Sequence, residues 1–345
     1  MANGKRIRDY LEVPSNYPTG TRNAITDVKG VRVGHATIHN EKAHTGVTII
    51  APHEKDPYRY PTPCAVAVGN GYGKLTGSIQ VEELGVTESY IGLTNTFSVA
   101  QVVQGLLEND VKSMRYTDGS MNILVGETND SYLSDMRGFH VRPEHVFEAL
   151  RNLSEDVEEG AVGAGAGTAC YGYKGGIGTA SRKVEVLGKT YTVGALLQTN
   201  FGGHLNIYGR EIRNLPQPRL QDKGSCMIVV ATDAPLCSRQ LKRLARRGIV
   251  GITHTGSFMS NGSGDFCIAF SNCADNLYER SDLSLHAMTM LPDDCLSPLF
   301  DACAEAVRES VYNSLAAACD LTGFEGRSLN AIDLETLLQD SKHEK

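Results

Sequence analysis

A serine in the last third of the chain is placed where it could act as a nucleophile. Residues 255–265 read TGSFMSNGSGD, and residues 266–271 read FCIAFS. Glycine, serine and asparagine in the first stretch predict a loop with tight turns. The short apolar stretch that follows predicts a buried strand. Ser263 therefore lies where a loop enters a strand, a rigid position whose glycine neighbours leave room for a substrate.

Two uses of this hydroxyl are compatible with the residues. The ordinary one is a turn hydroxyl that bonds the local backbone. The other is self-cleavage, in which Ser263 Oγ attacks the carbonyl of Gly262, an ester forms, and water releases a new chain that begins with Ser263. Gly262 leaves that carbonyl unhindered, and Asn261-Gly262 can adopt strained turn geometry.

Self-cleavage would put a nucleophile and a base on the same residue. A free α-amine has a pKa of roughly 7.7–8.0, whereas an unperturbed lysine has a pKa of about 10.4. Near pH 7.5 roughly a third of the α-amine is neutral, so it is a usable general base for its own hydroxyl. The predicted chemistry is then acyl transfer through a serine ester.

Two glycine-rich stretches offer weaker signals. Residues 160–168 (GAVGAGAGT) contain the spacing of a nucleotide-binding loop, but no apolar strand precedes them, so we expect a tightly packed turn. Residues 171–181 (YGYKGGIGTAS) enclose Lys174. This lysine is either a solvated loop charge or a cation held at a site against a carbonyl or carboxylate oxygen, and both interpretations remain open.

Composition excludes several classes of function. The 345 residues carry a formal net charge of −7, which argues against a nucleic-acid surface. No stretch of about 18 apolar residues predicts a membrane span, and the start of the chain does not predict a signal peptide. Nine scattered cysteines predict reduced thiols and a cytoplasmic location. The histidine pairs 35/39 and 140/145 do not have metal-site spacing, so we expect neither a metal nor another cofactor.

The elements that position these residues are strands interleaved with a few helices. Residues 23–35 show strand-like alternation around a Lys-Gly turn. Strands are also predicted at residues 45–52, 65–73, 90–96, 123–127, 191–202, 227–235 and 266–271. Helices are predicted at 99–107, capped by Ser98, at 143–153, from 238 to 249, and at 297–318. No stretch resembles a linker, so we expect one domain of packed layers, α+β or α/β.

The order of motifs resembles the L-aminopeptidase/D-esterase family of self-processing N-terminal serine peptidases, which includes the β-peptidyl aminopeptidases and nylon-oligomer hydrolases. The resemblance runs in order from about residue 15 to residue 325. The matching stretches are Asn23–His35 (NAITDVKGVRVGH), Thr45–Ile49 (TGVTI), Gly69–Gly77 (GNGYGKLTG), Leu93–Ser98 (LTNTFS), Gly126–Thr128 (GET), Gly138–Phe147 (GFHVRPEHVF), Tyr173–Ser181 (YKGGIGTAS), Gln198–Gly202 (QTNFG), Val230–Pro235 (VATDAP), Asn261–Ser271 (NGSGDFCIAFS) and Ser297–Phe300 (SPLF).

This resemblance implies a four-layered αββα sandwich in a single domain, residues 1–345, an α+β fold of the type shared with ornithine acetyltransferase. It also implies autocleavage between Gly262 and Ser263. The large fragment would be residues 1–262 and the small fragment residues 263–345. Both fragments would stay associated and assemble as a homotetramer of processed heterodimers.

Carried over residue by residue, the resemblance implies roles for five side chains. Ser263 matches the nucleophile, and Asn200 matches the asparagine that donates to the oxyanion. Lys174 and Tyr132 match positions that line the site, and Glu309 matches an acid that orients the new amine. Two residues before that acid some relatives carry a hydroxyl or a second acid, where this chain has Val307.

The expected activity is that of an aminopeptidase or amidase acting on short peptides, amides or esters with a free amino end. The acyl-enzyme would form on Ser263, with the α-amine of the same residue as base and no cofactor. One alternative is acyl transfer of the ornithine acetyltransferase type, although that family uses threonine and its motifs do not match. The other is an uncleaved, non-catalytic binding module, which Val307 favours.

Overall fold

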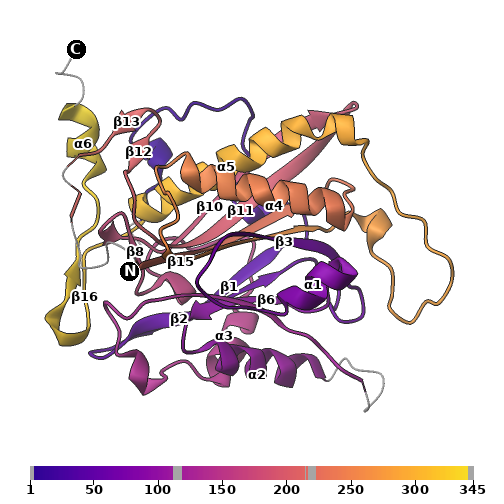
Figure 1. Ribbon diagram of the computed structural model, residues 1–345, viewed down its shortest axis with the longest axis horizontal. Helices are drawn as coiled ribbons and strands as arrows, with labels where there is room; N and C mark the ends of the chain where they lie inside the picture. The colour runs from indigo at the N-terminus through magenta and orange to yellow at the C-terminus, as the bar shows by residue number, and fades with distance from the viewer. Residues whose placement is uncertain (1–3, 112–118, 214, 217–222, 341–345) are drawn as a thin grey trace.

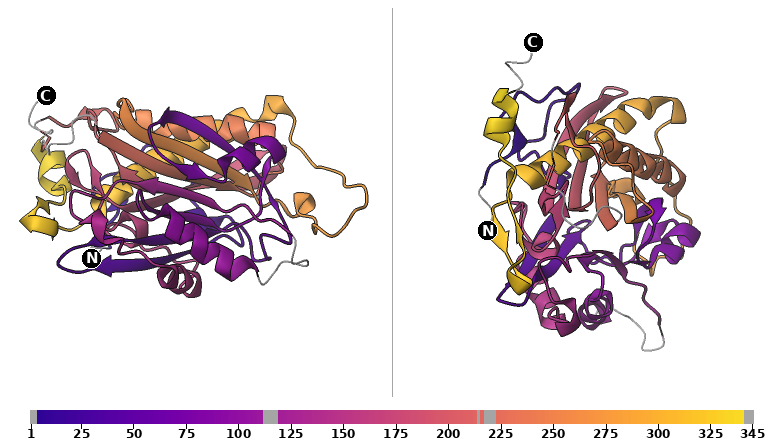
Figure 2. Two further views of the ribbon diagram at one scale, coloured as in Figure 1. Left: turned by 60° about the horizontal axis from the view of Figure 1, so that its bottom comes forward. Right: turned by 60° about the vertical axis from the view of Figure 1, so that its left-hand side comes forward.

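Two β-sheets lie face to face in the computed structural model, with helices over their outer faces (Figures 1 and 2). The structure describes residues 4–111, 119–213, 215–216 and 223–340. Three apolar clusters fill the spaces between helices and sheet, between the two sheets, and between the second sheet and its helices. The predicted four-layered αββα architecture is therefore confirmed.

The six-stranded sheet carries the centre of the molecule. Its order is β10-β11-β14-β15-β3-β5, and all neighbours are antiparallel except β14 and β15. The strands are β10 (Ile177–Val186), β11 (Lys189–Asn200), β14 (Lys223–Thr232), β15 (Gly262–Ser271), β3 (Thr62–Gly71) and β5 (Val86–Thr87). Along β15 alternate residues enter the two apolar clusters on either side of this sheet, as the two-residue period of a strand requires.

The five-stranded sheet has the order β1-β2-β6-β7-β4, and only β6 and β7 are parallel. Its strands are β1 (Arg32–His39), β2 (His44–Ala51), β6 (Ile91–Asn95), β7 (Leu124–Thr128) and β4 (Leu75–Thr76). Three short pairs complete the strands: β8 (Ala169–Cys170) with β9 (Tyr173–Lys174), β12 (Asn206–Ile207) with β13 (Arg210–Glu211), and β16 (Leu321–Thr322) with β17 (Ser328–Leu329).

Helices α4 (Ser238–Thr253) and α5 (Ser297–Ala316) pack on each other and on the outer face of the six-stranded sheet. Helices α2 (Val99–Asp110) and α3 (Pro143–Arg151) cover the other sheet (Figure 2). Helix α1 (Ser78–Leu84) lies against β3 and β5, and α6 (Leu334–Asp340) lies near the C-terminal end. The four longer helices agree with the predicted ones because each presents a clear apolar stripe.

Four details differ from the sequence-based expectations. Strand β15 begins at Gly262 instead of Phe266, because its small residues pair directly with β14. Residues 25–27 form a 3-10 turn where strand alternation was expected. Strand β10 was not predicted, since glycines at its start hide its apolar pattern. Ser98 precedes α2, but its buried hydroxyl makes no capping hydrogen bond.

The glycine-rich stretch 160–168 is a packed turn. A Cβ on Gly165 would lie only 2.5 Å from the backbone nitrogen of Ile177. Glycine is required there because two backbone segments touch without space for a side chain.

Candidate active site

Several strand ends of the six-stranded sheet meet at one edge and surround a cavity of about 1470 Å³. Strands β14 and β15 start at this edge because they are parallel, and their antiparallel neighbours β11 and β3 end there. The lining includes Tyr132, Asn200 and Gly262, three of the residues singled out in the sequence. The fold thus brings together residues that are up to 130 positions apart in the chain.

Ser263 is the second residue of β15 and is 1% exposed. Its hydroxyl has no hydrogen-bond partner among the described residues. Its backbone is held on both sides, because its N–H donates to Ser260 O at 2.9 Å and its carbonyl accepts from Tyr72 N at 3.2 Å. A buried, unpaired hydroxyl on a fixed backbone is free to react and is not committed to stabilising a turn.

Gly224 of β14 makes room for that hydroxyl. It pairs with Ser263, and a Cβ at this position would lie 2.9 Å from Ser263 Oγ and 3.4 Å from Cα of Phe201. Any side chain on residue 224 would therefore press the nucleophile out of its position. Phe201 forms the neighbouring wall of the cavity.

Asn200 ends β11, and β14 alone separates its strand from that of Ser263. Two strand spacings put the two backbones roughly 10 Å apart. The Asn200 Oδ1 accepts from Ala169 N at 3.1 Å, and its Nδ2 donates to Ser225 Oγ at 3.1 Å. Because the oxygen faces a backbone N–H, the amide orientation is fixed and its second Nδ2 hydrogen remains available at the cavity wall.

Lys174 does not line the cavity. It is fully buried, and its ammonium donates to the carbonyls of Gly165, Thr168 and Gly175 at 2.8–3.1 Å. Burial lowers the pKa of this lysine to about 7, although nearby Cys170 and Asp130 oppose the effect. The bond to Thr168 holds the residue before Ala169, so Lys174 supports Asn200 through the backbone.

Glu309 also lies away from the cavity. It is buried in α5, where its carboxylate accepts from Arg8, Asn23 and Arg182 at 2.6–2.8 Å. Its partner Arg182 lies opposite Val193 of β11, which is seven residues, or about 23 Å of strand, from Asn200. The Glu309 carboxylate is thus bound to two arginines and an asparagine at a distance from the cavity.

Val307, two residues earlier on α5, faces α4. A Cβ on Gly251 of α4 would lie 2.7 Å from the Val307 Cβ. This valine therefore belongs to the helix–helix contact. Its position in the fold explains its apolar character.

Two cavity residues were not singled out from the sequence. Glu127 at the end of β7 is almost fully buried and pairs with Lys74, Nζ to Oε1 at 3.1 Å. Ser225 accepts from both Asn200 Nδ2 and Asn129 N, the latter at 3.3 Å. Glu127 lies in the matching stretch GET, so a carboxylate at the end of a predicted strand was the sequence feature that could have identified it.

The comparisons with known proteins agree with this geometry. The model of peptidase family S58 matches residues 23–329. The chain belongs to peptidase family S58. It is 37% identical to beta-peptidyl aminopeptidase BapA of Sphingosinicella microcystinivorans, over 96% of this chain and 90% of that protein.

Solved structures of similar proteins extend the S58 assignment. The PH0078 protein from Pyrococcus horikoshii OT3 is 44% identical with a TM-score of 0.92, over 97% of this chain and 98% of that one. The L-aminopeptidase D-Ala-esterase/amidase from Ochrobactrum anthropi, described as a prototype of the serine aminopeptidases with a variant of the Ntn hydrolase fold, is 34% identical with a TM-score of 0.89 over 99% of both chains. This S58 chain is therefore a hydrolase, a serine aminopeptidase or amidase of the N-terminal nucleophile class. The comparisons do not favour the acyltransferase and binding-module alternatives.

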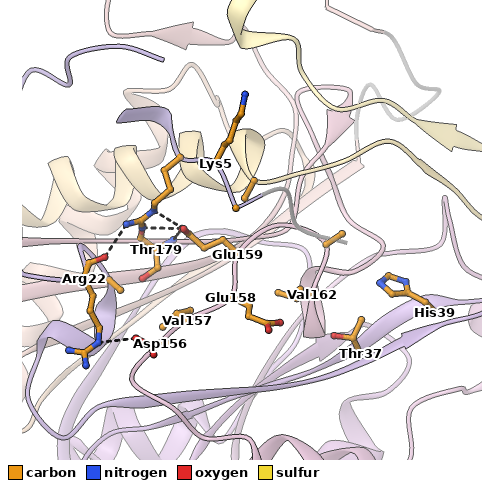
Figure 3. A pocket seen from close by; sticks show the side chains of 15 residues that line it. Lys5, Arg22, Thr37, His39, Asp156, Val157, Glu158, Glu159, Val162 and Thr179 are labelled. Atoms are coloured by element: carbon orange, nitrogen blue, oxygen red, sulfur yellow. Dashed lines mark hydrogen bonds and ion pairs between the residues drawn. The ribbon is translucent and has the colours of Figure 1, made fainter. Parts of the chain in front are cut away.

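A second cavity of the S58 chain, of about 750 Å³, lies beside the N-terminal arm (Figure 3). Charged side chains surround it, with Arg22 bonded to Asp156 at 3.2 Å, and none of the five candidate residues lines it. Among the described residues no three His, Cys, Asp or Glu side chains gather as a metal site would need. No helix in the described part of the chain has the length and apolar character of a membrane span.

Proposed function

We propose that the chain cleaves itself between Gly262 and Ser263 and that Ser263 is the nucleophile of the resulting aminopeptidase. The observation that carries this proposal is the buried hydroxyl of Ser263, unpaired among the described residues, which directly follows Gly262 of the cavity wall. The products would be residues 1–262 and 263–345. They would remain one folded unit, because β15 lies between β14 and β3 of the large fragment.

The turn before Ser263 supports the cleavage. Met259 has a φ of +52°, a strained conformation for a side chain of its size. Asn70 then donates from Nδ2 to the carbonyls of Ser260, Asn261 and Ser263. One side chain thus holds the backbone on both sides of the scissile bond, which prepares it for attack.

Hydrolysis would then proceed through an ester on Ser263. The new α-amine takes the hydroxyl proton, the hydroxyl attacks the substrate carbonyl, and the amine returns the proton to the leaving group. The free Nδ2 hydrogen of Asn200, with backbone N–H groups, stabilises the oxyanion. Water finally hydrolyses the ester and releases the acyl part.

We infer that Glu127 binds the positive amino end of the substrate. It is a buried carboxylate of this cavity and lies against Gly73, a position without a side chain. Tyr132 lines the same space and is packed on Leu133 and its neighbours, so it offers a fixed phenol near the substrate. The substrate class is a short peptide, amide or ester with a free amino group.

The names of the relatives suggest where a substrate search begins. BapA is a beta-peptidyl aminopeptidase, and the Ochrobactrum protein acts as an L-aminopeptidase and D-Ala-esterase/amidase. We propose N-terminal β-amino acids, L-alanine and D-alanine as the first panel. All nine cysteines are unpaired, which supports a cytoplasmic location.

The first prediction concerns self-cleavage. Intact-mass spectrometry under denaturing conditions is expected to give two masses for the wild type, split after Gly262, and one 37.3 kDa mass for Ser263→Ala. Ser260→Ala, a serine lost from the same loop, is the control and should process normally. The wild type and both variants are then assayed with anilides of the proposed panel of amino acids. Activity is expected only in the proteins that are cleaved. An uncleaved wild type, or a cleaved Ser263→Ala, would overturn the proposal.

A further inference from the structure

Self-cleavage needs a base that the mature enzyme does not need. In the unbroken chain the nitrogen of Ser263 is an amide whose N–H donates to Ser260 O. An amide nitrogen cannot accept the hydroxyl proton, so the α-amine that serves peptide hydrolysis does not yet exist. Another group next to Ser263 must take that proton.

Asp265 is the acid in the right place. It lies two residues after Ser263 in β15, so the two side chains share one face of the strand, about 6.6 Å apart along it. It is 0% exposed, and neither carboxyl oxygen has a hydrogen-bond partner among the described residues. A buried carboxyl without a partner contributes nothing evident to stability, so its presence at this position calls for another reason.

The surroundings leave Asp265 coupled mainly to Ser263. Burial raises the pKa of this carboxyl to about 6, and the nearby Ser263 hydroxyl offsets part of that effect. Across β14 lies Cys226, and behind it lie Cys170 and Tyr171. Burial raises the pKa of all three, so they are neutral near pH 7.

The remaining elements around Asp265 bring no charge to it. Strand β3 presents the neutral Asn70 opposite. Helix α4, which packs on β15, places Gly248 against Cys267, whose thiol pKa burial also raises. Glu127 is paired with Lys74 and lies against Gly73, whose neighbours Gly264 and Phe266 alternate with Asp265 along β15.

We propose that Asp265 is the catalytic base of self-cleavage, an inference that rests on the proposed cleavage at Ser263. The Asp265 carboxylate takes the proton of the Ser263 hydroxyl as Oγ bonds to the carbonyl carbon of Gly262. The C–N bond then breaks, and the carboxyl proton moves to the departing nitrogen of Ser263. The products are an ester between Gly262 and Ser263 Oγ and a free amine, and one water molecule then yields the Gly262 carboxylate and the Ser263 hydroxyl.

The test follows the rate of processing in cell-free translation of the full chain with labelled methionine, sampled between pH 5 and pH 8. Asp265→Asn is expected to process at least about 100-fold more slowly than the wild type, the usual effect of losing a general base. The wild-type rate is expected to fall about tenfold per pH unit below pH 6, because a protonated carboxyl cannot accept the proton. The residual rate of Asp265→Asn should not follow this pH dependence.

Asp110→Asn is the matched control. Asp110 is also buried, in α2, and burial raises its pKa to about 6 as well, but it lies in the helical layer over the other sheet. This variant should process at the wild-type rate with the wild-type pH profile. The melting temperature of Asp265→Asn should not fall, since its carboxyl makes no bond to lose.

Two results would overturn the proposal. One is processing of Asp265→Asn within threefold of the wild type. The other is a wild-type rate that stays level from pH 5 to pH 7. If instead the wild type is never cleaved, or Ser263→Ala is cleaved, the proposed function fails first and the role of Asp265 fails with it. Cleavage that is lost in Ser263→Ala but unchanged in Asp265→Asn would refute the role of Asp265 and leave the proposed function standing.

Discussion

At the scale of single residues, the site combines a side chain that hydrogen bonds hold in one orientation with a side chain that has no hydrogen bond among the described residues. Asn200 has its oxygen bound to Ala169 N and one Nδ2 hydrogen bound to Ser225. The Ser263 hydroxyl has no hydrogen-bond partner in the part of the chain that the structure describes. The asparagine is thus oriented in advance, while the serine remains free, and this is the division expected between an oxyanion donor and a nucleophile.

Loss of the Asn200 amide should therefore slow catalysis without unfolding the protein. Asn200→Ala is expected to reduce kcat by about 100- to 1000-fold on processed enzyme, with a smaller effect on KM. Steady-state kinetics with an aminoacyl anilide is the measurement. Asn206→Ala, outside the cavity lining, is the control and should keep wild-type kinetics. An unchanged kcat for Asn200→Ala would exclude it as the oxyanion donor.

Lys174 is a different case at the same scale. Its ammonium bonds three backbone carbonyls and is out of contact with the cavity. We infer that it is a positioning residue, which holds the turn at 165–168 and through Ala169 orients Asn200. Lys174 is thus neither a solvated loop charge nor a cation at the cavity, but a buried ammonium held by backbone carbonyl oxygens.

At the scale of elements, an ionic cluster of Arg8, Arg182, Glu305 and Glu309 ties α5 to the rest of the chain. Arg182 and the two glutamates are buried, and Arg8 lies at the exposed edge of the cluster. Arg182 is 0% exposed and donates to both glutamates, at 2.9 and 2.7 Å. Burial alone would raise the pKa of Glu309, but the bonds and charges of Arg8 and Arg182 and the bond from Asn23 lower it. The arginines belong to residues 1–262 and the glutamates to 263–345, so the cluster joins the two proposed fragments.

Breaking this cluster should cost stability and spare catalysis. Glu309→Gln is expected to lower the free energy of unfolding by about 3 kcal/mol at pH 7, because Arg182 loses a buried partner. Since the folded-state pKa of Glu309 is depressed, its contribution is present above the ordinary glutamate pKa of about 4.3 and is lost as the pH falls through the lower folded value.

Denaturant unfolding at pH 7 and pH 3 measures this difference. Glu279→Gln, which breaks the more exposed pair with Arg59, is the control and should leave the stability nearly unchanged, because solvent screens this pair. If Glu309→Gln kept full stability and lost activity, Glu309 would return as the residue that orients the amine.

At the scale of the whole molecule, the proposed cleavage cuts the chain without freeing a part of it. Strand β15 is an inner strand of the six-stranded sheet, and both its neighbours come from the large fragment. Helix α5 packs on β10, β11 and α4, which also belong to that fragment. Separation of the fragments would expose the core between helices and sheet.

The processed fragments are therefore expected to remain together in native mass spectrometry, as a multiple of the 37.3 kDa pair. A multiple of four would support the proposed homotetramer of heterodimers. The exposed apolar residues Leu283 and Leu285, on the loop that projects from the body in Figure 1, are candidates for such contacts. Release of the small fragment under native conditions would contradict the inference that the position of β15 between β14 and β3 holds the two fragments together.

The amino-acid sequence was sufficient to predict the elements with strong local patterns and the residues with unusual neighbours. The stripes of α2, α4 and α5 and the run around Ser263 were readable because each depends on residues close in the chain. The family order of motifs added Asn200 and Tyr132, and the cavity contains both.

Which residues come into contact depends on the packing of segments that are distant in the sequence. Strand β10 was hidden because glycines packed on α5 replace its apolar pattern, as at Gly178, where a Cβ would lie 1.9 Å from Ser310 O. The commitment of Glu309 to Arg8 and Arg182, and of Lys174 to three carbonyls, depends on contacts between distant segments. The isolation of Asp265 depends on burial, which is a property of the whole packed sheet and has no signature in local sequence.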